Sequence, residues 1–435
     1  MEVILKIRKG KFLSRGIRLH DMKYLAKDIP IEVMPAPEIV SISLGQHIGK
    51  PAVPVVKEGD FVYQGQLIAQ ADGPISANVY SSVSGTVEGF EKRPVANGAI
   101  KDYILIRNDG NYMYRPLDPL PDRNKETIIT RIREAGIVGM GGAGFPTAVK
   151  LAPKQTPDTL VINGAECEPY LTCDYRLMVE KTDEVAQGIR LIAKALGVTK
   201  IVVGIEKNKP DCIEKFASYE DFEIVVLRKA YPMGSEKHLI YSCTGRKVPV
   251  GKLPSDVGCV VNNIATAYAA YEAVELDKPL FERVMTVSGK AIVHPANLLV
   301  KNGTRFDDII THCGGLRDTT AMLVSGGPMM GPCMISTDLY SGKTDSGILA
   351  LDNSETDSRN PSPCINCGAC AEVCPMHLLP MMIDFYTQAR DYQKAREVGG
   401  VDNCISCGCC SYVCPARRAI VQSITLCKQK LASKG

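Results

Sequence analysis

The spacing of apolar residues changes along the chain and divides it into four regions. From about residue 36 to 115, short runs rich in β-branched residues alternate with turns such as Gly59-Asp60 and Gly65-Gln66. This pattern predicts small β-strands joined by tight turns. From Asn124 onward, helical periodicity alternates with continuous apolar runs, a pattern typical of helices packed on a buried sheet.

The second region predicts an α/β domain with a parallel sheet. Continuous apolar runs favour buried strands at Thr159–Asn163, Lys200–Ile205 and Glu223–Arg228. A predicted helix at Thr127–Ala135 precedes these strands, and an amphipathic helix at Asp183–Gly197 separates the first two. Strands that alternate with helices of this length form parallel sheets.

The last two regions predict a small α/β unit and a helical C-terminus. Residues 281–335 pair strand-like runs with a short helix, and the polar, proline-containing segment Ser354–Pro363 is the clearest linker in the chain. Beyond the linker, two groups of apolar residues recur at helical spacing. These are Leu379, Met382, Ile383 and Tyr386, and then Ile420, Val421, Ile424, Cys427 and Leu431.

The length and composition are typical of a globular protein that contains several domains. A chain of 435 residues exceeds one core, and 45% hydrophobic with 23% charged residues is ordinary for globular proteins. The net charge of +3 gives no argument for nucleic acid. No apolar run approaches the roughly 20 residues that span a bilayer, so we expect membrane association only through partners. Seventeen cysteines favour a reducing compartment over a disulfide framework.

Eight of the cysteines form two identical patterns. Both CINCGACAEVCP and CISCGCCSYVCP read C-x2-C-x2-C-x3-C-P, the spacing that holds [4Fe–4S] clusters. In such pairs the fourth cysteine of each run binds the neighbouring cluster. We therefore assign Cys364, Cys367, Cys370 and Cys414 to one cluster, and Cys404, Cys407, Cys410 and Cys374 to the other. Zinc sites or disulfides fit two triplet-plus-one runs poorly, and Cys409 falls outside the spacing.

A glycine-rich run lies early in the α/β region. GMGGAGFPTAVK (Gly139–Lys150) offers four glycines followed by a lysine, which suit backbone and charge contacts to a phosphate. A tight structural loop would explain the run equally well. It does not match the dinucleotide fingerprint, because no strand directly precedes it.

Three more polar segments follow in the same region, and together the four resemble a known family. The three segments are NGAECEPYLTCDYR (Asn163–Arg176), YPMGSEK (Tyr231–Lys237) and VNNIAT (Val261–Thr266). With the glycine-rich run before them, they resemble the NADH-binding flavoprotein of respiratory complex I over residues 125–270. The whole chain is similar to the family of C subunits of Rnf complexes. That similarity adds GAECEPYL, KLPSDVG, GGPMMG and the paired cysteine runs.

The resemblance implies a multidomain α/β fold with an α-helical ferredoxin. The implied parts are a barrel-sandwich hybrid over 1–120, an FMN- and NADH-binding α/β domain over 121–278, a soluble-ligand-binding β-grasp (SLBB) domain over 279–353, and a two-cluster ferredoxin domain over 354–435.

The resemblance also implies which residues hold the flavin. They are Gly139, Gly141, Gly142, Gly144, Lys150, Asn163, Tyr231, Gly234, Asn262, Asn263 and Thr266, with Glu166 and Glu236 near the nicotinamide or flavin. Amide, lysine and backbone N–H groups are what a phosphate, a polyol chain and a flavin ring require. The chain departs from the complex I pattern at Arg15–Lys23, which replaces a glycine-rich run, and at Cys167 and Ser235.

The first region resembles biotinyl and lipoyl carrier domains. We identify Ser81–Gly85 as the segment that matches the exposed carrier tip; it has no lysine, so we expect no covalently attached cofactor. GGPMMG (Gly326–Gly331) is interpreted as packing, although an interface is an alternative, and we expect His294 and His312 to be structural.

Three functions are compatible with this sequence. The first is an electron-transfer protein that exchanges electrons between NAD(H), FMN and two clusters, bound to membrane and ferredoxin-like subunits of an Rnf-type complex on the cytoplasmic face of the membrane. That complex couples ferredoxin:NAD+ oxidoreduction to Na+ or H+ translocation. The second is a soluble reductase of the corrinoid-reductase or proline-reductase-donor type. The third is a non-catalytic scaffold whose flavin site has decayed.

Overall fold

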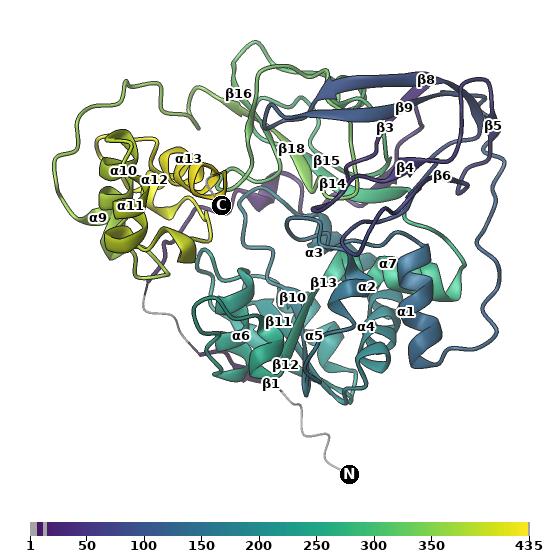
Figure 1. Ribbon diagram of the computed structural model, residues 1–435, viewed down its shortest axis with the longest axis horizontal. Coiled ribbons are helices and arrows are strands. Elements are labelled where there is room, and N and C mark those ends of the chain that lie inside the picture. Colours follow the sequence, from purple (N-terminus) through teal and green to yellow (C-terminus); the bar gives the residue numbers. More distant parts are fainter. Residues whose placement is uncertain (1–6, 12–14, 434–435) are drawn as a thin grey trace.

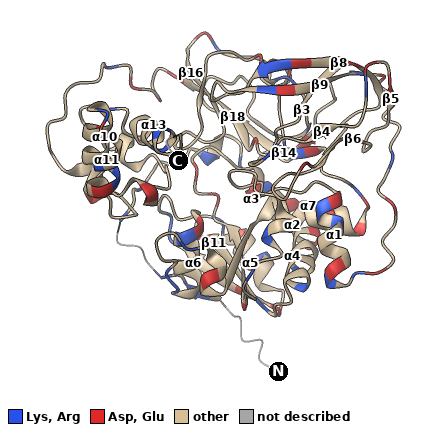
Figure 2. Cartoon of the chain, viewed as in Figure 1, with Lys and Arg blue, Asp and Glu red and all other residues tan. Residues whose placement is uncertain are grey.

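The structure is a computed structural model that describes residues 7–11 and 15–433. The chain folds into four parts (Figure 1): a β-sandwich, an α/β domain, a mixed-sheet domain, and a helical C-terminal domain set to one side. Blue and red segments alternate over all four parts (Figure 2), in keeping with the small net charge of +3.

The β-sandwich packs a four-stranded sheet, ordered β3-β9-β8-β5, on a three-stranded sheet, ordered β4-β6-β7. The strands are β3 (Ile39–Ser43), β4 (Val53–Pro54), β5 (Phe61–Val62), β6 (Leu67–Gln70), β7 (Val79–Tyr80), β8 (Gly85–Pro94) and β9 (Ile100–Asn108). Inward-facing side chains such as Val40, Ile42, Ile104 and Ile106 are fully buried between the sheets. The small strands that the sequence predicts here are confirmed.

The prediction that Ser81–Gly85 forms an exposed tip is wrong. Ser81, Ser82 and Ser84 have no exposed surface, because the segment is covered by the mixed-sheet domain, where Ser82 Oγ donates to Asn302 O at 2.6 Å. The turn that does project from the sandwich joins β6 to β7 and exposes Gly73–Ile75. No lysine occurs between Ala71 and Asn78 either, so the expectation of an unmodified domain stays a prediction.

The α/β domain contains a five-stranded parallel sheet ordered β1-β12-β11-β10-β13. The strands are β1 (Ile7–Lys9), β10 (Thr159–Gly164), β11 (Lys200–Glu206), β12 (Phe222–Leu227) and β13 (Cys259–Asn263). Its helices are α1 (Lys125–Glu134), α2 (Thr147–Lys150), α3 (Cys173–Glu180), α4 (Thr182–Leu196), α5 (Pro210–Ala217), α6 (Glu236–Thr244) and α7 (Ile264–Glu275), with a 3-10 turn at Pro254–Val257.

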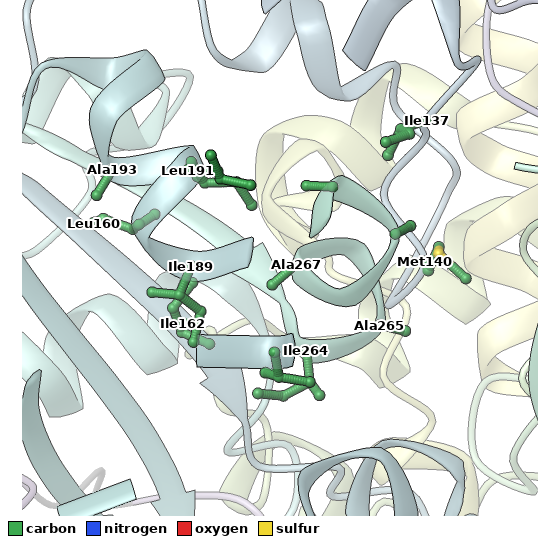
Figure 3. Close-up of a cluster of buried hydrophobic side chains, with 14 of the residues drawn as sticks. Ile137, Met140, Leu160, Ile162, Ile189, Leu191, Ala193, Ile264, Ala265 and Ala267 are labelled. Atoms are coloured by element: carbon green, nitrogen blue, oxygen red, sulfur yellow. The ribbon is translucent and has the colours of Figure 1, made fainter. Parts of the chain in front are cut away.

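The core of this domain lies between the sheet and helices α4 and α7. Leu160 and Ile162 of β10 pack with Ile189 of α4 and with Ile264 and Ala267 of α7 (Figure 3). All five side chains are fully buried, which stabilises the fold by about 1.5–3 kcal/mol for each large aliphatic residue. This core fixes where β10 and β13 end, and therefore where the polar residues after them lie.

The mixed-sheet domain has six strands, ordered β17-β16-β18-β14-β15-β2. They are β2 (Ile31–Val33), β14 (Glu282–Ser288), β15 (Ala296–Lys301), β16 (Thr320–Ser325), β17 (Cys333–Met334) and β18 (Gly347–Asp352), with helix α8 (Phe306–His312) packed on them. His312 pairs with Glu32 of β2 at 2.9 Å, in line with its expected structural role.

The C-terminal domain is helical, as predicted. Its helices are α9 (Ala369–Glu372), α10 (Pro380–Gln388), α11 (Tyr392–Gly399), α12 (Cys409–Tyr412) and α13 (Ile420–Ala432), with a 3-10 turn at Val401–Asn403. Ile383, Ala395, Ile424 and Cys427 form its buried core together with cysteines of the two runs. Within residues 7–11 and 15–433, no helix is both long and apolar enough to cross a bilayer.

The N-terminal segment does not belong to the β-sandwich alone. The sequence predicts one unit over residues 1–120, of which residues 1–6 and 12–14 lie outside the described part. Strand β1 instead pairs with β12 of the α/β domain, and β2 pairs with β15 of the mixed sheet. A 3-10 turn at Lys23–Leu25 lies between these two strands. The segment that carries β1 and β2 thus ties the α/β and mixed-sheet domains together.

Candidate functional site

Polar residues gather at the carboxyl edge of the parallel sheet. Asn163 of β10 lies in register with Asn263 of β13, while Asn262 precedes Asn263 on the same strand. In open α/β sheets this edge is where ligands bind. The glycine-rich run reaches the same edge at Asn263, and the segment before α6 reaches it at Asn163, through Gly234 O.

The glycine-rich loop between α1 and α2 is fastened to strand β13 and helix α7. Met140 N donates to Thr266 Oγ1 at 3.0 Å, and Gly139 N donates to Phe145 O at 2.8 Å. A Cβ on Gly141 would lie 2.9 Å from the Asn263 amide nitrogen, so any larger residue would force Asn263 to move. A Cβ on Gly142 would meet nothing within 4 Å, which means that this part of the loop faces open space. Thr266 therefore anchors the loop.

Two of the predicted asparagines, Asn163 and Asn263, already form hydrogen bonds within the protein. Asn263 caps α7 by accepting from Ala265 N at 2.9 Å, and its Nδ2 donates to Asp174 at 2.6 Å. Asn163 Nδ2 donates to Gly234 O at 2.9 Å. These side chains shape the edge of the sheet and fix the segment that carries Gly234.

Asn262 and Thr147 are two residues near this edge whose buried polar atoms lack a hydrogen-bond partner within the described part of the chain. Asn262 is 5% exposed and its Nδ2 has no hydrogen-bond partner within the described residues. Thr147, which begins α2 directly after the glycine-rich loop, has a buried hydroxyl that is also unpaired in that part of the chain. Buried polar groups are nearly always hydrogen-bonded, so an unpaired amide and hydroxyl beside an open glycine loop fit a polar ligand such as FMN.

Lys150 and Glu236 face each other across this edge. Their side chains form an ion pair of 2.7 Å and are 30% and 41% exposed. The lysine ends α2, and the glutamate is the first residue of α6. A phosphate that approaches Lys150 therefore meets a cation that already has a carboxylate partner.

Glu166 is buried in an ion pair. Its Oε2 lies 3.3 Å from Lys23 Nζ, and its Oε1 accepts from Asp174 N at 2.8 Å at the start of α3. Both partners in the ion pair are less than 10% exposed. Lys23 belongs to the segment that replaces the glycine-rich run of complex I, so this departure in sequence supplies the cation that holds Glu166.

Glu168 joins the site to the mixed-sheet domain; the sequence places it two residues after Glu166, but it is not among the predicted site residues. Its carboxylate accepts from Tyr231 Oη at 3.2 Å and from Met329 N at 3.0 Å. Burial raises the pKa of Glu168 to about 7 and, together with the Glu168 charge, raises the pKa of Tyr231. A Cβ on Gly327 would lie 2.3 Å from Glu168 Oε2, which explains one glycine of GGPMMG. That segment packs on the site, as expected.

The cysteines of the two runs come together in the crossed arrangement that the spacing predicts. The outer cysteine set is defined as Cys364, Cys367, Cys370 and Cys414. It lines one cavity together with Met381, Asp384 and Arg418. Cys374, Cys404, Cys407 and Cys410 are called the inner cysteine set. Burial raises the pKa of Cys374, and the nearby Cys407 and Cys404 add to the shift, which places Cys374 beside the second run. Each set supplies four cysteines, the number of thiolates that hold a [4Fe–4S] cluster. Their roles as ligands stay predictions.

The inner cysteine set lies against the α/β domain. Cys407 and Cys409 pack with Tyr231, Ile17 and Met329 in one buried cluster. His238 of α6 donates from Nε2 to Pro375 O at 3.2 Å, across the same contact. Cys364 and Cys367 of the outer set are exposed. No sequence pattern signals this contact, because its residues are far apart along the chain.

Four known domain families match the chain. They are described as the RnfC barrel sandwich hybrid domain over residues 11–111, the Nuo51 FMN-binding domain over 132–272, the SLBB domain over 284–332, and the 4Fe-4S dicluster domain over 356–415. The predicted fold class is confirmed by these matches.

Curated relatives match over nearly the whole chain. The C subunit of the proton-translocating ferredoxin:NAD(+) oxidoreductase complex of Clostridium ljungdahlii is 46% identical over 98% of this chain and 95% of its own length. The C subunit of the Na(+)-translocating ferredoxin:NAD(+) oxidoreductase complex of Acetobacterium woodii is 40% identical over 99% of both. The C subunit of the ion-translocating oxidoreductase complex of Rhodobacter capsulatus is 46% identical over 96% of this chain and 83% of its own.

A solved structure shares the fold at low identity. A chain of an NAD+-reducing [NiFe]-hydrogenase in the H2-reduced state superposes with a TM-score of 0.50 and 16% identity. The match covers 71% of this chain and 65% of the hydrogenase chain.

Proposed function

The chain belongs to the family of C subunits of Rnf-type, ion-translocating ferredoxin:NAD+ oxidoreductase complexes, and from that membership we propose how its residues direct electrons. It is an electron-transfer component of an oxidoreductase, with FMN, NAD(H) and [4Fe–4S] clusters as its cofactors. Bound FMN supplies the conversion between a two-electron hydride and single electrons.

The glycine-rich loop, Lys150, Thr147 and Asn262 bind the flavin in this proposal. The open face at Gly142 leaves room for a phosphate, and Lys150 contributes a cation at the end of α2. Asn262 and Thr147 supply the buried polar groups that lack partners within the described residues. Asn163, Asn263 and Thr266 hold the surrounding backbone, and Glu166 acts through the Lys23 pair rather than as a free carboxylate.

The order of the two cysteine sets carries the proposal. Cys407 of the inner cysteine set packs against Tyr231 of the α/β domain, while Cys364 and Cys367 of the outer set are exposed. We infer that the inner set exchanges electrons with the flavin and the outer set exchanges them with a partner. Glu168 helps to fix this order, because its hydrogen bonds to Tyr231 and Met329 hold the α/β and mixed-sheet domains together where the inner set docks.

The order is tested with single-turnover reduction by NADH. In a Cys404→Ser variant that lacks the inner cluster, NADH should reduce the outer cluster far more slowly than in the unaltered protein. In a Cys364→Ser variant, the inner cluster should still be reduced at the normal rate. If NADH reduced the outer cluster at the same rate with and without the inner cluster, the proposed order of electron transfer would be refuted.

The partners follow from the family and are proposals for this chain. We propose that it binds membrane and ferredoxin-like subunits of a complex that couples ferredoxin:NAD+ oxidoreduction to Na+ or H+ translocation, on the cytoplasmic face of the membrane. Co-purification of the tagged chain with membrane subunits in mild detergent supports this arrangement. Recovery of all the chain free of membranes, with full NADH activity, would favour the soluble reductase.

A further inference from the structure

A lysine with no exposed surface lies where three domains meet. Lys343 lies in the loop between β17 and β18 of the mixed-sheet domain and is 0% exposed. Its Nζ donates to Asn78 O of the β-sandwich at 2.5 Å and to Gly136 O of the α/β domain at 2.7 Å. Gly136 lies three residues before the glycine-rich loop begins.

The environment of Lys343 is unusual for a packing residue. Both hydrogen bonds of its ammonium group that the structure shows go to backbone carbonyls. The nearby Asp345 carboxylate accepts from Gly342 N at 2.7 Å instead. Burying a charged ammonium group without a carboxylate partner costs free energy of folding. An apolar residue of similar length would fill the same space without that cost. The two N–H bonds of a neutral amine match the two carbonyls.

The same junction also touches the far end of the glycine-rich loop. A Cβ on Gly144 would lie 2.8 Å from Thr344 Cγ2 and 3.1 Å from His47 Cα. Ile48 N donates to Gly144 O at 3.4 Å, which ties the loop to the β-sandwich. The loop is therefore held at both ends by two neighbouring domains.

The β-sandwich contributes a second polar contact to the junction. Gln46 Oε1 accepts from Lys343 N at 3.0 Å, and Arg283 donates to Lys343 O at 2.8 Å. The backbone N–H and C=O of Lys343 are thus both held by side chains of the neighbouring structure.

We propose that Lys343 is a positioning residue for flavin binding, and that the carrier-like β-sandwich serves here as a brace for the glycine-rich loop. This inference rests on the proposed function, in which the loop binds FMN. The braced loop presents its N–H groups in one conformation, so FMN binds without first having to order the loop. Loss of the brace lowers the fraction of molecules that are competent to bind.

The test compares Lys343→Met with a matched control. Lys343→Met keeps an unbranched side chain as far as Cε and removes both hydrogen bonds of Nζ. Ser82→Ala removes another buried contact between the β-sandwich and the mixed-sheet domain, Ser82 Oγ to Asn302 O at 2.6 Å, away from the loop. Hydrogen exchange over residues 136–148 is measured in flavin-free protein, and FMN affinity is measured by fluorescence titration.

We expect faster exchange in Lys343→Met and an FMN affinity lower by about tenfold, with Ser82→Ala unchanged in both. Unchanged exchange in Lys343→Met, or an equal effect of the two variants, would overturn the brace. If Lys343→Met does not fold, Gln46→Ala replaces it, because it removes the acceptor for Lys343 N and otherwise only a bond within the β-sandwich, Gln46 Nε2 to Ser43 O at 3.0 Å. A wild-type protein that binds no FMN refutes the proposed function, while the exchange measurement still decides whether the loop is braced.

Discussion

The Lys150 ammonium lies 2.7 Å from the Glu236 carboxylate, although the sequence predicted one beside the flavin phosphate and the other beside the nicotinamide or flavin ring. Because both side chains are about a third exposed, this ion pair contributes at most about 1 kcal/mol to stability. A charged hydrogen bond from Lys150 to a phosphate contributes roughly 1.5–3 kcal/mol, so binding of Lys150 to the phosphate would be favoured over its pairing with Glu236. The pair thus holds Lys150 in place without preventing it from binding a ligand.

Replacing Lys150 by Glu should abolish FMN binding, because it removes the cation and sets two carboxylates against the phosphate. The clusters should still assemble and be reduced by dithionite, since the cysteines lie in a separate domain. NADH should no longer reduce them. Flavin absorbance and EPR of the clusters measure the three outcomes.

Glu236→Gln serves as the control for the lysine variant. It removes the ion pair but leaves Lys150 charged, so FMN should bind as tightly as before or up to a few-fold more tightly. Bleaching of the clusters by NADH in flavin-free Lys150→Glu protein would contradict the assigned path from NADH to the clusters.

Crossed ligation is tested by Cys374→Ala. The variant should lose the cluster held by Cys404, Cys407 and Cys410 and keep the one held by Cys364, Cys367 and Cys370, as resolved by EPR. Loss of the outer cluster alone would show that the runs do not cross. Cys409→Ala should leave both clusters in place, although Cys409 packs against Tyr231 and its loss should weaken the domain contact.

Stability should depend on pH through Lys343. Burial lowers the pKa of its ammonium group to about 7, from 10.5 in the unfolded chain. Between pH 7 and about 10 the unfolded chain therefore binds more protons, so the folded state gains stability as the pH rises, by up to about 1.4 kcal/mol per pH unit. Lys343→Met should lack this gain. The urea midpoint of the unaltered protein minus that of Lys343→Met should increase from pH 7 through pH 8 to pH 9, and a constant difference would contradict the assignment.

Intact-mass measurement tests the unmodified β-sandwich. No biotin or lipoate should be attached between residues 36 and 115, because neither the buried Ser81–Gly85 segment nor the exposed Gly73–Ile75 turn contains a lysine. A mass increase of either size that maps to this region would refute the prediction.

Local patterns predicted the parts of the structure that depend on neighbouring residues. Strand β10 and helix α4 follow from their apolar spacing, and the cysteine grouping follows from ligand spacing. The pairs Lys23–Glu166 and Glu168–Met329 are 143 and 161 residues apart, so no periodicity connects them. The prediction that Ser81–Gly85 is exposed failed for a related reason. A short motif match indicates the local fold of a segment, but it does not show that another domain covers that segment.

The paths of β1 and β2 constrain how the protein is made. A ribosome releases the residues of these strands before those of their partners, β12 and β15, which emerge about 215 and 265 residues later. The β-sandwich can close early, whereas the segment that carries β1 and β2 pairs only after these later strands have left the exit tunnel. A substitution that weakens β1 or β2 would therefore act on a late step of assembly, the joining of the α/β and mixed-sheet domains.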